Sequence, residues 1–161
     1  MDLPQLWELG DDESPLGESE DLARAYDAEV GLVDRLRGWR DETATVWTLD
    51  SRVVSGMVGE VYRDAVLIVG ERVNSLIPMT ATVRCRGPYR PHRVATGVQR
   101  ASGLGAVRAR IGREIVVHLV GLPAQQGVVT VVGADHVGIA APGGEDLLPW
   151  ARTAAIEWAT G

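Results

Sequence analysis

The sequence predicts a mainly β protein made of two tandem five-stranded small barrels, each preceded by a helix. Two observations point to this fold class. The same pattern of residues occurs twice in the 161-residue chain, once around Asp64 and again around Asp135. Short stretches of alternating apolar residues are separated by Gly, Asp and Pro. No stretch approaches the ~20 apolar residues of a membrane-spanning helix. A chain of this length forms one ordinary domain or two small ones that share an interface.

The repeat is the stronger of these observations. When the range 43–85 is aligned with 114–156 without an insertion, ten of the paired positions are identical. The identical pairs are Val46/Val117, Gly56/Gly127, Val58/Val129, Val61/Val132, Asp64/Asp135, Val66/Val137, Ile68/Ile139, Leu76/Leu147, Pro78/Pro149 and Thr82/Thr153. Chance would give roughly three or four identities over such a length in a Val-rich chain. We infer an internal duplication, and the constant distance along the chain from Asp64 to Asp135 is called the repeat spacing below.

The first copy is expected to hold one helix and five strands. Apolar residues recur every three or four positions from Leu22 to Leu36, which places them on one helical face. Ser19 suits the N-cap of this helix and Gly38 suits its end. Strands are expected at about 43–49, 57–62, 65–69, 75–78 and 82–86. Asp64 marks a tight turn, because Asp bonds its own backbone there.

The second copy repeats this pattern. Leu104, Val107 and Ile111 have helical spacing, and Gly112 is expected to end a short helix. Strands are expected at about 114–120, 127–132, 136–141, 146–149 and 153–158, with Asp135 at the tight turn. Five short strands within ~45 residues suit a small, strongly bent antiparallel sheet or barrel.

A helix followed by five bent strands, with Gly in the second strand and Asp at the next turn, resembles the Sm-like (LSm, Hfq-type) fold. The second copy, "REIVVHLVGLPAQQGVVTVVGADHVGIAAPGGEDLLPWARTAAIEW", carries the likeness through Gly127, Asp135 and the closing "LPWARTAAI". The first copy matches through Gly56 and Asp64. The resemblance implies that the fourth strand of one barrel pairs with the fifth strand of the next, so that we expect a homo-oligomer.

The resemblance also implies RNA binding. RNA-binding members carry an aromatic residue or His shortly after the turn Asp, followed by Asn. Val66 and Val137 occupy these positions here and cannot stack on a base, whereas His136 is adjacent to the second of them. Arg152 is a loose match to the Arg-Gly pair that precedes the last strand in the family. His136 and Arg152 are therefore candidate RNA contacts.

Charge is strongly segregated along this chain of net charge −6. Residues 1–71 carry 17 acidic residues and 6 Arg, whereas residues 72–113 carry 9 Arg and no acid. Residues 114–161 carry 5 acids and 1 Arg, and the chain contains no Lys. The average charge argues against a general nucleic-acid binder, but the middle block is suited to phosphate contacts.

The stretch between the copies, "RCRGPYRPHRVATGVQR", is the main candidate binding site. It interleaves Arg with Tyr and His, the residue types by which proteins contact phosphates and stack on bases. The candidate RNA-binding residues in it are Arg84, Arg86, Tyr89, Arg90, His92 and Arg93. The alternative is a linker whose Arg side chains pair with the acidic N-terminal half of the chain.

Four segments result: an acidic tail (1–18), a helix and first barrel (19–86), a basic linker (87–99), and a helix and second barrel (100–161). The tail carries Leu3, Leu6 and Trp7 among its acids, and we expect it to be disordered alone. It docks on a protein partner, covers the basic face as a strand mimic, or only keeps the protein in solution.

No catalytic, metal or cofactor motif assembles, because the three His residues are scattered and Cys85 is the single cysteine. The sequence therefore predicts a cytoplasmic, non-enzymatic tandem Sm-like module that binds RNA or a ribonucleoprotein partner and no membrane. The alternative is a protein–protein adaptor or regulatory scaffold without RNA binding. An enzyme with an unrecognised site is a third reading.

Overall fold

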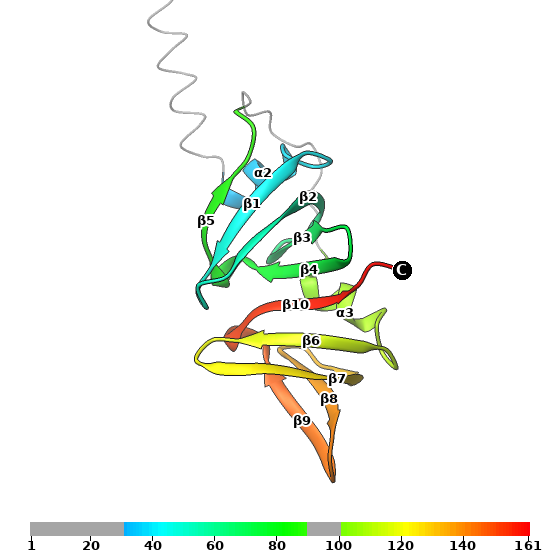
Figure 1. Ribbon diagram of the computed structural model, residues 1–161. Coiled ribbons are helices and arrows are strands. Elements are labelled where there is room, and N and C mark those ends of the chain that lie inside the picture. Colours follow the sequence, from blue (N-terminus) through cyan, green and yellow to red (C-terminus); the bar gives the residue numbers. More distant parts are fainter. Residues whose placement is uncertain (1–30, 90–100) are drawn as a thin grey trace, which may run out of the picture. The chain divides into compact units, whose positions relative to one another are not determined.

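Ten strands and two short helices form the described part of the chain (Figure 1). The computed structural model describes residues 31–89 and 101–161. The first half contains α2 (Leu32–Arg37), β1 (Thr43–Thr48), β2 (Val53–Val61), β3 (Ala65–Val69), β4 (Val73–Pro78), the 3₁₀ turn η1 (Met79–Ala81) and β5 (Thr82–Arg86). The second half contains α3 (Gly103–Arg108), β6 (Glu114–Leu119), β7 (Leu122–Val132), β8 (His136–Ala141), β9 (Gly144–Pro149), the 3₁₀ turn η2 (Trp150–Arg152) and β10 (Thr153–Ala159). The prediction of a mainly β chain is confirmed.

All ten strands belong to one antiparallel sheet with the order β5-β1-β2-β3-β4-β10-β6-β7-β8-β9. Each half has the same internal order, with its last strand beside its first. The halves meet where β4 pairs with β10, in the register Leu76 opposite Ile156 and Ser75 opposite Glu157. Residues 32–161 therefore form one compact unit.

Backbone hydrogen bonds recur at the repeat spacing. The amide of Met79 donates to the carbonyl of Asp64 and the amide of Trp150 donates to that of Asp135, both at 2.8 Å. These bonds join each β-turn after the second strand to the 3₁₀ turn before the last strand. The same backbone bond thus closes the same corner in both halves.

Three predicted boundaries are wrong. Strands β2 and β7 begin earlier than expected, at Val53 and Leu122. Their first portions pair with β1 and β6, and their second portions with β3 and β8, so that partner strands supply hydrogen bonds to a stretch without clear alternation. Helix α3 also ends at Arg108, before the expected Gly112, and Ile111 is half exposed. The N-terminal part of the helix predicted from Ser19 lies outside the described residues.

Two clusters of buried apolar side chains lie on the two sides of the junction. The strands at the junction are buried on both faces: Leu76 and Ile156 pack into the second-half cluster, whereas Ile77 and Ala155 pack into the first-half cluster. This two-sided burial is typical of strands in the middle of a sheet. Each half therefore completes the core of the other.

Helix α3 begins against the first half. The Asp64 carboxylate accepts a hydrogen bond from the amide of Gly103 at 2.7 Å, and the Ser102 hydroxyl accepts one from the amide of Leu104 at 3.1 Å. Side-chain acceptors at these positions satisfy amides that the first helical turn leaves unpaired. A Cβ on Gly103 would lie 2.7 Å from that of Ala65, so that only Gly fits.

We expect Gly56→Val and Gly127→Val each to lower the free energy of unfolding by more than about 1 kcal/mol, the overpacking range. A Cβ at Gly56 would lie 2.5 Å from the carbonyl oxygen of Val69, and one at Gly127 would lie 2.9 Å from that of Ala140, so Gly56 should be the more sensitive. Gly105→Ala is the control, because nothing lies within 4 Å of its Cβ. Urea denaturation of the three variants measures this; equal stabilities would contradict it.

Candidate nucleic-acid interface

The outer face of β1 and β5 carries an aromatic side chain between two Arg side chains. On β1 the side chains of Ala44, Val46 and Thr48 are buried, so Trp47 lies on the opposite face. Trp47 pairs across the strands with Arg84. The Arg84 guanidinium lies 4.4 Å from the centre of the Trp47 ring and that of Arg86 lies 5.5 Å from it. Trp47, Arg84 and Arg86 are called the Arg–Trp surface below.

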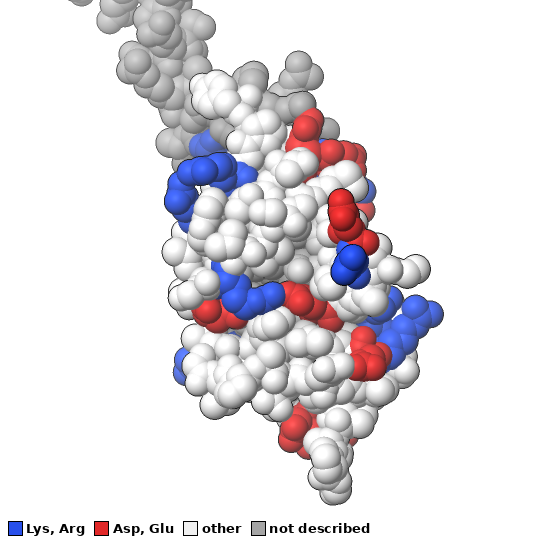
Figure 2. Space-filling model, viewed as in Figure 1, with Lys and Arg blue, Asp and Glu red and all other residues white. Residues whose placement is uncertain are grey.

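The Arg–Trp surface is positively charged and open. Arg84 and Arg86 are exposed, and within residues 31–89 and 101–161 no carboxylate lies at ion-pair distance from either. Figure 2 shows basic side chains gathered beside β5, at the upper left of the view. The predicted pairing of these two Arg with acids of the first half is thus not seen in the described part of the chain.

The chain leaving β5 is held against Trp39. The Trp39 indole donates a hydrogen bond to the carbonyl of Pro88 at 3.0 Å, and Gly87 lies so close to the ring that a Cβ would come within 2.5 Å of it. Tyr89 follows with its side chain fully exposed. The predicted site residues Arg90, His92 and Arg93 lie outside the described residues.

The remaining predicted site residues, His136 and Arg152, lie in the second half of the chain. His136 begins β8, its Nδ1 lies 2.8 Å from the Asp135 carboxylate, and its ring rests against Gly133. Arg152 ends η2 with its side chain exposed, and its carbonyl accepts a hydrogen bond from the amide of Val120. In the order of the sheet, β5 is the first strand, β10, which Arg152 precedes, is the sixth, and β8 is the ninth, so neither His136 nor Arg152 lies on a strand beside β5.

Val66 and Val137, the positions where the family resemblance implies base stacking, are fully buried in the two cores. A ligand cannot reach them. Trp47 is the aromatic residue that sequence reasoning missed. The clue in the sequence was a Trp at an outward position of the first strand, which pairs with the fifth strand and its Arg-Cys-Arg stretch.

A charged cluster lies at the junction of the halves, also unforeseen. Arg52 of the β1–β2 connection forms an ion pair with Glu157 of β10. His118 Nε2 lies 3.3 Å from the other Glu157 oxygen, close enough for an ion pair when the ring is protonated. The pKa of Glu157 is lowered from 4.5 to about 2; the His118 ring contributes most, burial opposes the shift, and Arg52 adds to it. Glu157 is therefore an anion at neutral pH.

The described residues contain no group of three or more His, Cys, Asp or Glu side chains that could hold a metal ion. Burial raises the pKa of the Cys85 thiol, which favours the neutral, unreactive form. Within the same residues, no helix has both the length and the apolar character needed to cross a bilayer.

We expect Glu157→Gln to lower the free energy of unfolding at pH 7 by about 2 kcal/mol, because Arg52 loses its charge partner. In the native protein the folded pKa lies below the unfolded one, so this contribution is present above pH 4.5 and is lost as the pH falls towards 2. The variant should therefore lose less stability than the wild type over this range. Thermal unfolding from pH 7 to 2.5 measures it, with exposed Glu145→Gln as control. Parallel pH profiles for wild type and Glu157→Gln would contradict the assignment.

No family model matches the chain, and none of the curated proteins is detectably similar to it. What the protein binds is therefore inferred from its own residues.

Proposed function

We propose that this chain is a non-enzymatic binding module of two tandem Sm-like barrels, and that it binds single-stranded RNA through the Arg–Trp surface. The common strand order of the halves and their hydrogen bonds, which recur at the repeat spacing, support the tandem arrangement. The observation that carries the RNA proposal is Trp47 beside two exposed Arg side chains that have no carboxylate partner among the described residues.

The Arg–Trp surface combines the two features that single-stranded nucleic acids require. Guanidinium groups contact phosphates, and aromatic rings or guanidinium planes stack on unpaired bases. Because Arg84 already lies over an aromatic ring, less of its side-chain entropy is lost on binding. The exposed Tyr89 adds a second ring shortly beyond Arg86. Such a surface would bind single strands with little sequence preference.

We expect the double variant Arg84→Ala/Arg86→Ala to bind single-stranded RNA at least tenfold more weakly at low salt, since a hydrogen bond to a charged group contributes about 1.5–3 kcal/mol. The matched control is Arg108→Ala/Arg113→Ala, which removes the same charge from exposed positions of the second half. Loss of two phosphate contacts should also lower the salt slope by about 1.4. Fluorescence anisotropy of a labelled oligonucleotide measures both quantities.

If both double variants lose the same RNA affinity, binding depends only on the net charge of the protein. That result would contradict a site at the Arg–Trp surface. Absence of RNA binding by the wild type, with and without residues 1–18, would refute the RNA proposal and leave the adaptor. The shortened chain belongs in the experiment because the acidic tail can compete with RNA for the same Arg side chains.

A protein-binding role is the second candidate, and the end strands of the sheet favour it. Strands β5 and β9 each have one neighbour among the described residues. They are the equivalents, at the repeat spacing, of the strands β10 and β4 that pair within the chain. Transferring the register of that junction sets Cys85 opposite Leu147 and Arg86 opposite Asp146. A basic residue thus meets an acidic one.

The strands β4 and β10 also differ in burial from their equivalents β9 and β5. Leu76 and Ala154 are fully buried there, whereas their equivalents Leu147 and Val83 are 59% and 61% exposed. Unpaired edges with exposed apolar side chains favour association with another strand. On this reading the partner is a second copy of the chain, added head to tail through β5 and β9. Because Ala155, the equivalent of Arg84, is buried, such pairing would compete with RNA.

We expect light scattering at tens of micromolar to give a mass above that of the 17.3 kDa monomer. Arg86→Asp and Asp146→Arg should each weaken association, because like charges then face each other, and the double variant should restore it. A monomeric wild type, or a double variant no better than the single ones, would refute this pairing.

A further inference from the structure

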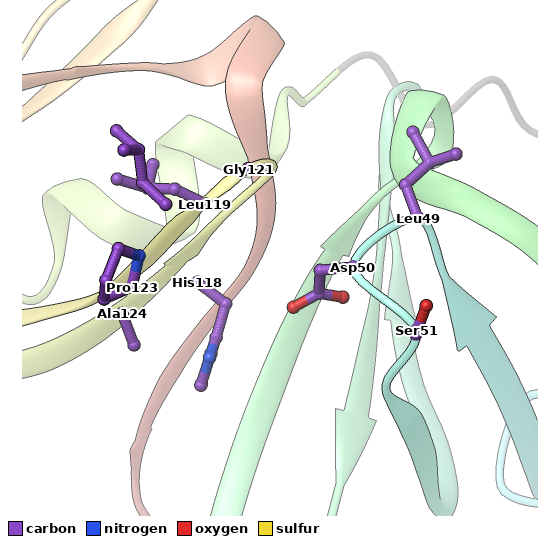
Figure 3. A pocket seen from close by; sticks show the side chains of 9 residues that line it. Leu49, Asp50, Ser51, His118, Leu119, Gly121, Pro123 and Ala124 are labelled. Carbon is purple, nitrogen blue, oxygen red and sulfur yellow. The ribbon is translucent and has the colours of Figure 1, made fainter.

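A pocket of about 470 Å³ lies between the β1–β2 turn and the β6–β7 turn (Figure 3). This volume falls within the range of roughly 300–1,000 Å³ that is usual for small-ligand sites. One side is formed by Leu49, Asp50 and Ser51 of the first half, and the other by His118, Leu119, Gly121, Leu122, Pro123 and Ala124 of the second. None of the three residues of the Arg–Trp surface lines it, so a ligand here is independent of RNA.

Apolar and polar residues share the walls of the pocket. Leu119, Leu122, Pro123 and Ala124 line the side formed by the second half. Two large apolar side chains of the lining, Leu49 and Leu122, are 53% and 67% exposed. Neither side chain belongs to one of the two buried clusters. A ligand with an apolar body would cover them and gain free energy by removing them from water.

The charge at the pocket is set by Asp50. Its carboxylate accepts a hydrogen bond from the Thr48 hydroxyl, and no basic side chain of the described residues forms an ion pair with it. Arg52, which follows shortly in the chain, is engaged by Glu157. Arg52 is therefore not the charge partner of Asp50. In Figure 3, Asp50 and His118 lie on facing sides of the pocket.

We propose that this pocket binds a small organic cation, an ammonium or guanidinium group on a short apolar chain, with Asp50 as its charge partner. The cationic end would lie at the Asp50 carboxylate and the apolar chain against Leu119, Leu122 and Pro123. A partly desolvated carboxylate attracts a cation more strongly than one in open water. The Asp50 carboxylate would repel an anion.

The test is a titration of the full-length, ¹⁵N-labelled protein with three probes of similar size: n-butylammonium, 1-butanol and butyrate. Butylammonium should shift the amide signals of Leu49, Ser51 and Leu122 and should bind at least tenfold more tightly than butanol. Asp50→Asn should bring this ratio close to one, while the control Asp135→Asn, which changes an exposed carboxylate elsewhere, should leave it unchanged. Thermal unfolding of Asp50→Asn checks that the fold is retained.

Absence of shifts with butylammonium, tighter binding of butyrate, or an unchanged ratio in Asp50→Asn would each overturn the proposal. Because the Arg–Trp surface is intact in Asp50→Asn, its affinity for RNA should equal that of the wild type. The outcome is thus separate from that of the RNA experiment.

Discussion

The pairing of β4 with β10 is the interaction on which the rest of the structure depends. Each half alone is about 60 residues, a size at which a chain buries only about 60% of its unfolded surface. Pairing makes two five-stranded sheets continuous and buries both faces of the two strands, with Leu76 and Ile77 packed into different cores. Docking of α3 on Asp64 strengthens the same junction, because the start of the second half is bonded directly to a turn of the first.

The junction also explains why equivalent backbone positions have different surroundings. Trp47 of β1 corresponds to His118 of β6, and Arg86 of β5 corresponds to Glu157 of β10. In the second half these positions face the first half, where Glu157 is paired with Arg52 and largely buried. In the first half they face outward as the Arg–Trp surface. The Arg52–Glu157 pair therefore helps to hold the halves together, whereas the Arg–Trp surface stays exposed to solvent.

Edge position and charge connect the two candidate functions. Strand β5 carries the Arg–Trp surface and is also an end strand of the sheet. RNA would use its side chains, whereas a second copy of the chain would use its backbone and cover part of the same side chains. A strand with these properties suits a module that exchanges one partner for another.

The sequence by itself determined the strands, the turns at Asp64 and Asp135 and the exposed Arg residues of β5, because alternation and turn chemistry are local properties. It could not determine which side chains meet. Trp47 and Arg84 come together through the register of β1 on β5. Arg52 and Glu157, which are 105 residues apart in the sequence, come together because the two halves pair. The early starts of β2 and β7 were missed for the same reason, since partner strands supply the hydrogen bonds there. Cross-strand register depends on packing of the whole sheet, and only the tertiary structure decided it.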